Sequence, residues 1–139
     1  MKLTNLIALL MFLGIIGISC NISANKEKDE KGSEIKRKAE TVAIYYFHNT
    51  RRCATCKAVE SVTKEAVEEM ENKKVSFTGF NLEKTEGEKK AKELGVSGQT
   101  LLIVGGDKKV NITQEGFMYA RTKPKTLKEI VQQKVNSLL

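Results

Sequence analysis

Histidine and cysteine are scarce in this sequence, which has one histidine, His48, and three cysteines among its 139 residues. A zinc ion held by Cys53 and Cys56 would need two further ligands, and His48 is the one histidine that can supply one. A closed zinc site within a single chain is therefore disfavoured, whereas a dimer that joins two cysteine pairs would complete four thiolates. A structural disulfide framework is disfavoured as well, because the short loop between Cys53 and Cys56 constrains the unfolded chain very little.

Long apolar runs are also missing. The run Leu6–Ile18 has thirteen residues, whereas a transmembrane helix needs about 20. Its length suits a signal peptide, with a basic residue before it and the small residue Ser19 after it. The sequence Gly17-Ile18-Ser19-Cys20 resembles a bacterial lipobox, with Gly17 in place of the usual leucine. We therefore expect residues 1–19 to be removed and Cys20 to be acylated, with plain secretion and a retained anchor as the alternatives.

Residues 20–40 form a lipid anchor and a flexible tether in this interpretation. The segment after Cys20 has almost no apolar residues and mixes both charges, so it cannot bury enough surface to offset the entropy lost on folding. Residues 41–139 then make one domain, long enough for a single core. The formal net charge is +7, but charges of both signs alternate along the predicted helices. This pattern indicates a solvated surface, and no nucleic-acid partner is expected.

The hydrophobic pattern of residues 41–139 predicts an α/β domain. Strands are expected at 42–47, 75–82, 101–104 and 109–113, and helices at 53–71, at 85–94 and after Pro124. Gly95 is expected to end the second helix in the left-handed conformation. The order β-α-β-α-β-β-α implies a parallel crossover followed by an antiparallel hairpin. It therefore predicts a central mixed sheet with helices on both faces.

The most informative motif is Cys53-Ala-Thr-Cys56, at the predicted start of a helix. Thiolates are the nucleophiles of disulfide exchange, and a helix N-terminus with nearby cations lowers a cysteine pKa from about 8.5 toward roughly 3.5–7.5. Cys53 is expected to be the exposed nucleophile, and Cys56, one turn later, the resolving thiol. Arg51, Arg52 and Lys57 are candidate supporting residues, although solvated surface is an open alternative for each.

This element order, with Cys-x-x-Cys at the first strand–helix junction, resembles the thioredoxin superfamily across residues 41–139. Lys57 and the Gly95-Val96 step also match the pattern of that superfamily. More narrowly, residues 46–60 resemble a small bacterial family of thioredoxin-like proteins associated with nitrophenyl-compound nitroreductase. The resemblance implies a thioredoxin-like fold and thiol–disulfide chemistry.

Two residues depart from the thioredoxin pattern. In the loop before the third strand, Gln99 stands where thioredoxins have a cis-proline that faces the cysteines, and Thr100 follows it. Both are candidate site residues. Six residues before Cys53, Phe47 replaces the usual buried acid, so a local proton acceptor for Cys56 is missing.

These features together predict a membrane-tethered thiol–disulfide oxidoreductase of the bacterial cell envelope, which faces the periplasm or lies on the outer face of the membrane. Its expected partners are a protein thiol or disulfide and, through Cys20, the membrane, and no cofactor is expected. One alternative is a dithiol protein without catalytic activity that binds a metal or metalloid, or serves as an accessory subunit of a redox complex. Another is an interaction module in which Cys53 and Cys56 form a permanent disulfide.

Cys20 provides a test of the expected anchor. Replacing it by alanine removes the sulfur that would carry the lipid, so Cys20→Ala should release the protein from the membrane fraction or mislocalise it. Fractionation and the mass of the wild-type and variant chains measure this. A variant that stays in the membrane fraction at its precursor mass would show that the apolar run itself is the anchor.

Overall fold

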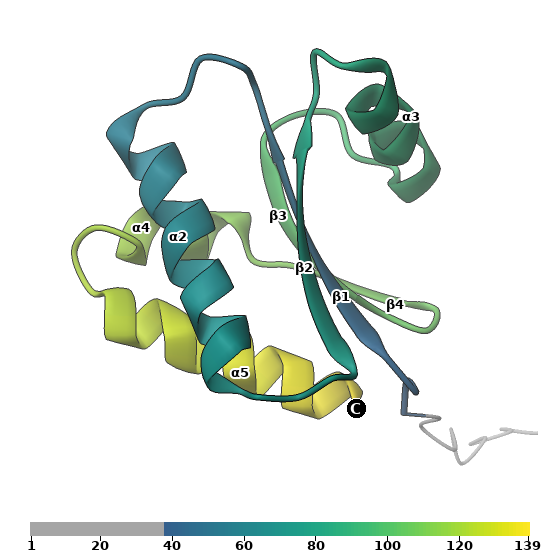
Figure 1. Ribbon diagram of the computed structural model, residues 1–139, viewed down its shortest axis with the longest axis vertical. Helices are drawn as coiled ribbons and strands as arrows, with labels where there is room; N and C mark the ends of the chain where they lie inside the picture. Colours follow the sequence, from purple (N-terminus) through teal and green to yellow (C-terminus); the bar gives the residue numbers. More distant parts are fainter. Residues whose placement is uncertain (1–37) are drawn as a thin grey trace, which may run out of the picture. The chain divides into compact units, whose positions relative to one another are not determined.

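The computed structural model describes residues 38–139, and it begins where the chain enters the domain (Figure 1). The expected signal peptide, Cys20 and residues 21–37 lie outside the described residues. Ala39, which falls within the expected tether, is already part of the fold, because its backbone N–H donates to the carbonyl oxygen of Leu138 at 2.7 Å. Within residues 38–139, no helix has both the length and the apolar character needed to cross a bilayer.

A four-stranded mixed sheet forms the centre of the domain. Its strands are β1 (Val42–His48), β2 (Val75–Asn81), β3 (Thr100–Gly105) and β4 (Lys108–Asn111), in the order β2-β1-β3-β4. β1 pairs with β2 in parallel and with β3 antiparallel, and β4 continues the sheet as the antiparallel hairpin partner of β3. The expected parallel crossover and antiparallel hairpin are both confirmed.

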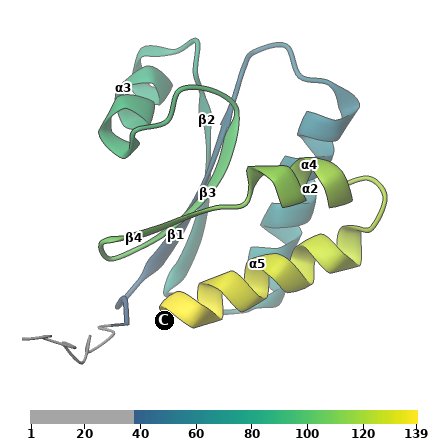
Figure 2. The same cartoon turned by 180° about the vertical axis from the view of Figure 1, so that it is seen from behind.

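Helices cover both faces of the sheet. They are α2 (Ala54–Glu69), α3 (Thr85–Leu94), α4 (Thr113–Tyr119) and α5 (Pro124–Leu138). The two views show α2, α4 and α5 together on one face and α3 alone on the other (Figures 1 and 2). Gly95 ends α3 with φ at 73°, as expected for a left-handed C-cap. The predicted α/β class with a mixed sheet between helices is confirmed.

Helix α4 is the element that the sequence pattern does not predict. The expected strand at 109–113 ends at Asn111, and Thr113 begins α4 instead. The Thr113 hydroxyl donates to Asn111 Oδ1 at 2.6 Å and accepts from the Leu101 backbone N–H at 2.9 Å, which fixes the turn from β4 into the helix. Gly116 hides the helical pattern because glycine disfavours helix interiors. At this position a Cβ would lie 3.2 Å from Leu101, so close packing accounts for the glycine.

The alternation of β1 side chains separates two apolar regions. Ile44 and Tyr46 are fully buried in the main core under α2 and α5, whereas Tyr45 and Phe47 point to the face covered by α3. There Phe47 stacks on Phe80 of β2, with ring centroids 5.6 Å apart. The strand therefore ends at the cysteine loop with different environments on its two faces.

Helix α2 is held in place along its length. Its buried residues Val59 and Ala66 pack into the main core. Lys128 of α5 forms ion pairs with Glu65 and Glu69 of α2, at 3.0 and 2.6 Å. These contacts fix the rotation of α2 about its axis and its position along the sheet. They therefore also fix where the cysteines at its first turn lie, at the carboxyl end of β1.

Candidate active site

Cys53 occupies the N-cap position of α2. Its backbone is extended, with φ at −73° and ψ at 169°, and its sulfur accepts a hydrogen bond from the Cys56 backbone N–H at 3.3 Å. A thiolate therefore takes the place that a serine or aspartate oxygen usually has at a helix start. Cys53 is exposed, whereas Cys56 faces inward and is only 4% exposed.

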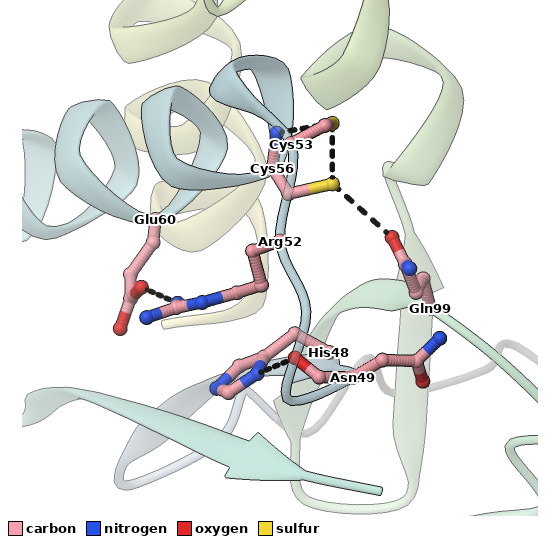
Figure 3. A network of polar contacts seen from close by, with 7 residues as sticks. All are labelled: His48, Asn49, Arg52, Cys53, Cys56, Glu60 and Gln99. Carbon is pink, nitrogen blue, oxygen red and sulfur yellow. Dashed lines mark hydrogen bonds and ion pairs between the residues drawn. The ribbon is translucent and has the colours of Figure 1, made fainter.

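The two sulfurs are in contact as free thiols. Cys53 Sγ and Cys56 Sγ lie 2.8 Å apart, and the Cys56 thiol donates to Gln99 Oε1 at 3.4 Å. Figure 3 shows the three side chains in series, from the exposed cysteine to the loop before β3. The Gln99 amide oxygen is thus in contact with the buried thiol.

The environment of Cys53 favours its thiolate. Hydrogen bonds from the Cys56 thiol and then from the Cys56 backbone N–H lower the pKa of Cys53 below its ordinary value, with a smaller contribution from the Thr55 backbone N–H. The two backbone donors are free amides of the first helical turn, which carry the positive end of the helix dipole. The expected activation of Cys53 by a helix N-terminus therefore has a direct structural counterpart.

The two arginines lie differently from one another. Arg51 is exposed, whereas Arg52 forms an ion pair with Glu60 of α2 (Figure 3). The hydrogen bonds that lower the pKa of Cys53 come from Cys56 and from backbone amides, so the arginines are not needed to explain it. Lys57 is exposed on α2, and only its backbone N–H, which donates to the Cys53 carbonyl at 3.1 Å, touches the site.

The loop before β3 is shaped by Thr100. Its hydroxyl donates to the Gly98 carbonyl at 3.0 Å, and the turn so formed presents Gln99 to Cys56. A surface hollow of about 480 Å³ opens beside Gln99, between this loop and α3, with Asn49 and Val96 in its lining. On the other side of the cysteine loop, a ring N–H of His48 donates to the Asn49 carbonyl at 3.0 Å, which suits a structural role for His48.

Two site residues were missed by the sequence reasoning, Tyr46 and Glu60. The sequence comparison places the missing acid at Phe47, but the Phe47 side chain points to the α3 face. Tyr46 lies on the opposite face of β1, toward Cys56. Because adjacent side chains of a strand point to opposite faces, the sequence could have shown that only one of Tyr46 and Phe47 faces Cys56. Glu60 follows Cys56 by four residues, which places both on one face of α2.

No cluster of three or more histidine, cysteine, aspartate or glutamate side chains within residues 38–139 is placed to hold a metal ion. The dithiol of Cys53 and Cys56 supplies two soft ligands on one side only. The exposed Cys53 and the buried Cys56, whose sulfurs lie in contact, are suited to exchange between thiol and disulfide.

Comparison with known proteins finds similarity to solved structures alone. No family model matches it, and no curated protein matches its sequence. Similar solved structures include chloroplastic thioredoxin z, with 22% identity over 70% of this chain and 80% of that one and a TM-score of 0.49. A thioredoxin from Thermus thermophilus has 18% identity over 69% and 75%, with a TM-score of 0.40. A malarial protein has 17% identity over 52% and 80%, with a TM-score of 0.41.

The strand order and the cysteine pair together define the fold class. The sheet order β2-β1-β3-β4, with a parallel β1–β2 pair and an antiparallel β3–β4 hairpin, is that of a thioredoxin-like α/β fold. Cys53 and Cys56 lie at its first strand–helix junction. The expected thioredoxin-like fold with a Cys-x-x-Cys pair is confirmed.

The unequal burial and pKa of the two thiols lead to a direct prediction. Iodoacetamide should modify Cys53 before Cys56, and the rate should rise with pH around a midpoint below the value of about 8.5 for a free thiol, because a lowered pKa exposes the thiolate at lower pH. Mass spectrometry of peptides from protein quenched at several pH values measures both rates. Arg51→Gln should leave the midpoint unchanged, and preferential labelling of Cys56 would contradict the assigned roles.

Proposed function

We propose that this protein is a thiol–disulfide oxidoreductase, tethered through Cys20 to a membrane of the bacterial cell envelope and facing the periplasm. The observation that carries the proposal is the pairing of two unequal thiols. Cys53 is exposed at a helix start and has a lowered pKa, and Sγ of the buried Cys56 lies 2.8 Å from Cys53 Sγ. One thiol can attack a partner, and the other can complete the exchange.

The exchange proceeds in two steps. The Cys53 thiolate attacks one sulfur of a partner disulfide, so that a mixed disulfide forms and the other partner sulfur leaves as a thiolate. Cys56 then attacks Cys53 Sγ, which forms the Cys53–Cys56 disulfide and releases the second partner sulfur. Two electrons pass from the dithiol to the partner, and the two thiol protons end on the partner sulfurs. The same steps in reverse oxidise a partner dithiol.

The hollow beside Gln99 supports a protein partner for this chemistry. It opens between α3 and the loop that contacts Cys56, so a polypeptide lying there would pass close to the cysteine pair. Thr100 contributes to this surface indirectly, through the turn that it closes at Gly98.

The direction of β1 is consistent with a membrane tether at the N-terminal side of the domain. The chain enters the domain at Ala39, next to the carboxyl end of α5, and β1 then runs away from that end toward Cys53 (Figure 1). A seven-residue strand spans about 23 Å. A tether from Cys20 would therefore join the domain at the end opposite the cysteine pair.

A second candidate function is a dithiol binder or an accessory subunit of a redox complex. The observation that favours it is Gln99, whose amide oxygen faces Cys56 where thioredoxins have proline. An amide leaves the sulfurs open to a soft metal or to the cysteine pair of a second copy. The narrower sequence resemblance, to nitroreductase-associated proteins, belongs with this candidate.

Oxidised glutathione separates the two candidates. Reduced wild-type domain should release two glutathione molecules for each domain oxidised and end with a Cys53–Cys56 disulfide. Cys56→Ser should release one and stop at a glutathione adduct on Cys53, because the resolving sulfur is absent. Cys53→Ser is the matched control and should react far more slowly. Thiol quantification and intact-protein mass measure each product.

Two results would contradict the oxidoreductase. One is a wild-type domain that stops at the adduct as Cys56→Ser does. The other is native protein that contains stoichiometric metal and loses it in Cys53→Ser, which would favour the binder.

A further inference from the structure

Tyr46 carries a buried hydroxyl that the fold leaves without a partner. The side chain is fully buried in the main core, and within residues 38–139 its oxygen makes no hydrogen bond of acceptable geometry. An unsatisfied buried hydroxyl is costly, and native proteins seldom keep one without a reason. A phenylalanine would fill the same space without this cost, so the oxygen calls for an explanation.

The surroundings of the Tyr46 hydroxyl belong to the cysteine site. Cys56 and Glu60 of α2 and Arg52 of the cysteine loop are the side chains whose charges act on the pKa of the phenol. Glu60 also reaches over β2, since a Cβ on Gly79, the residue paired with Tyr46, would lie 3.2 Å from its Oε1.

Other neighbours of Tyr46 add little charge. The His48 ring lies 5.7 Å from the Tyr46 ring and is turned toward the Asn49 carbonyl. On β3, the paired residue Leu101 is apolar. The groups that could respond to the hydroxyl are therefore Cys56, Glu60 and Arg52, and the last two already neutralise each other in an ion pair.

The protonation state of Cys56 decides whether this hydroxyl has an acceptor. In the reduced protein, the Cys56 thiol donates to Gln99, and a thiol sulfur is only a weak acceptor. When Cys56 loses its proton, the sulfur becomes a charged acceptor, for which hydrogen bonds are roughly twice as strong. The hydroxyl is thus unpaired beside the thiol but would be paired beside the thiolate.

We propose that Tyr46 is a positioning residue for the resolving step, in which its hydroxyl donates a hydrogen bond to the Cys56 thiolate. This inference rests on the proposed oxidoreductase function and assigns one of its steps. Phe47, which stands in place of the usual buried acid, has no polar group to offer Cys56. The phenol of Tyr46 would supply a polar group instead, as a hydrogen-bond donor.

The chemistry of the hydroxyl fits a permanent donor. Burial raises the pKa of Tyr46 above its ordinary value, followed by the negative charge of a Cys56 thiolate and by hydrogen bonding of the phenol to Cys56. Arg52 opposes this shift, and Glu60 adds to it. Tyr46 therefore keeps its proton throughout the working pH range. In the resolving step, Cys56 Sγ bonds to Cys53 Sγ, the bond from Cys53 to the partner breaks, and the proton of Cys56 passes through solvent to the departing partner thiolate.

Tyr46→Phe removes this donor with almost no change in volume. Wild-type and variant domains are first reduced and then mixed with oxidised glutathione. Samples taken by rapid acid quench show the formation and the decay of the Cys53–glutathione adduct. Formation should be unchanged, because Cys53 does not contact Tyr46 in the proposed step. Tyr45→Phe, on the same strand but facing α3, is the matched control.

Decay of the adduct should be about three- to tenfold slower in Tyr46→Phe. Loss of a hydrogen bond to the thiolate should raise the pKa of Cys56 by about one to two units. The thiolate fraction then falls about tenfold per unit. A more basic thiolate is also a better nucleophile, which recovers about half of the loss in rate on a logarithmic scale. In a Cys53→Ser background, the alkylation midpoint of Cys56 should also move to higher pH with Tyr46→Phe. A merely structural role would not move this midpoint.

The possible outcomes separate the inference from the function on which it rests. Slower decay and a raised midpoint in Tyr46→Phe, with Tyr45→Phe like the wild type, would support the role of the hydroxyl. Equal decay and an equal midpoint in Tyr46→Phe and wild type would overturn it and leave the oxidoreductase standing, and equal slowing in both tyrosine variants would overturn it too. A wild-type domain that forms no adduct would overturn the proposed function and this inference together.

Discussion

The hydrogen bond from the Cys56 backbone N–H to Cys53 Sγ is the interaction on which the rest of the site depends. It exists because Cys53 stands at the N-cap of α2, where the first amides of the helix have no carbonyl partner. One residue of shift in the helix start would turn each side chain by about 100°. Cys53 would then leave the surface or Cys56 would leave the interior. The packing of α2 against the sheet and its ion pairs with Lys128 therefore protect the chemistry of the thiols.

This constraint makes the two thiols unequal. Cys53 receives donors from the helix and is open to a partner, whereas Cys56 is enclosed and donates its proton to Gln99. The amide of Gln99 adds no charge beside the buried sulfur. Beside the site, Arg52 and Glu60 neutralise each other in an ion pair. The site is thus polar but carries little net charge.

The sequence predicts the parts of the fold whose signal is local. Alternation and helical spacing locate β1, α2 and α3, and Gly95 marks a C-cap because its left-handed backbone suits glycine. Helix α4 escapes prediction because Gly116 is required by tertiary packing and weakens the local pattern. The cysteine pair is visible from spacing alone. The pairing of Arg52 with Glu60 and the contact of Gln99 with Cys56 depend on how a loop crosses the sheet, and no local pattern contains that information.

The reduction potential of the Cys53–Cys56 pair tests the central claim most directly. The domain is equilibrated with glutathione buffers of defined ratio, from both the reduced and the oxidised side, and the fraction of disulfide is read after acid quench. A reversible midpoint above about −300 mV, identical from both sides, is expected for a dithiol that cycles. A disulfide that stays below about −300 mV, or a dithiol that never oxidises in these buffers, would contradict the oxidoreductase.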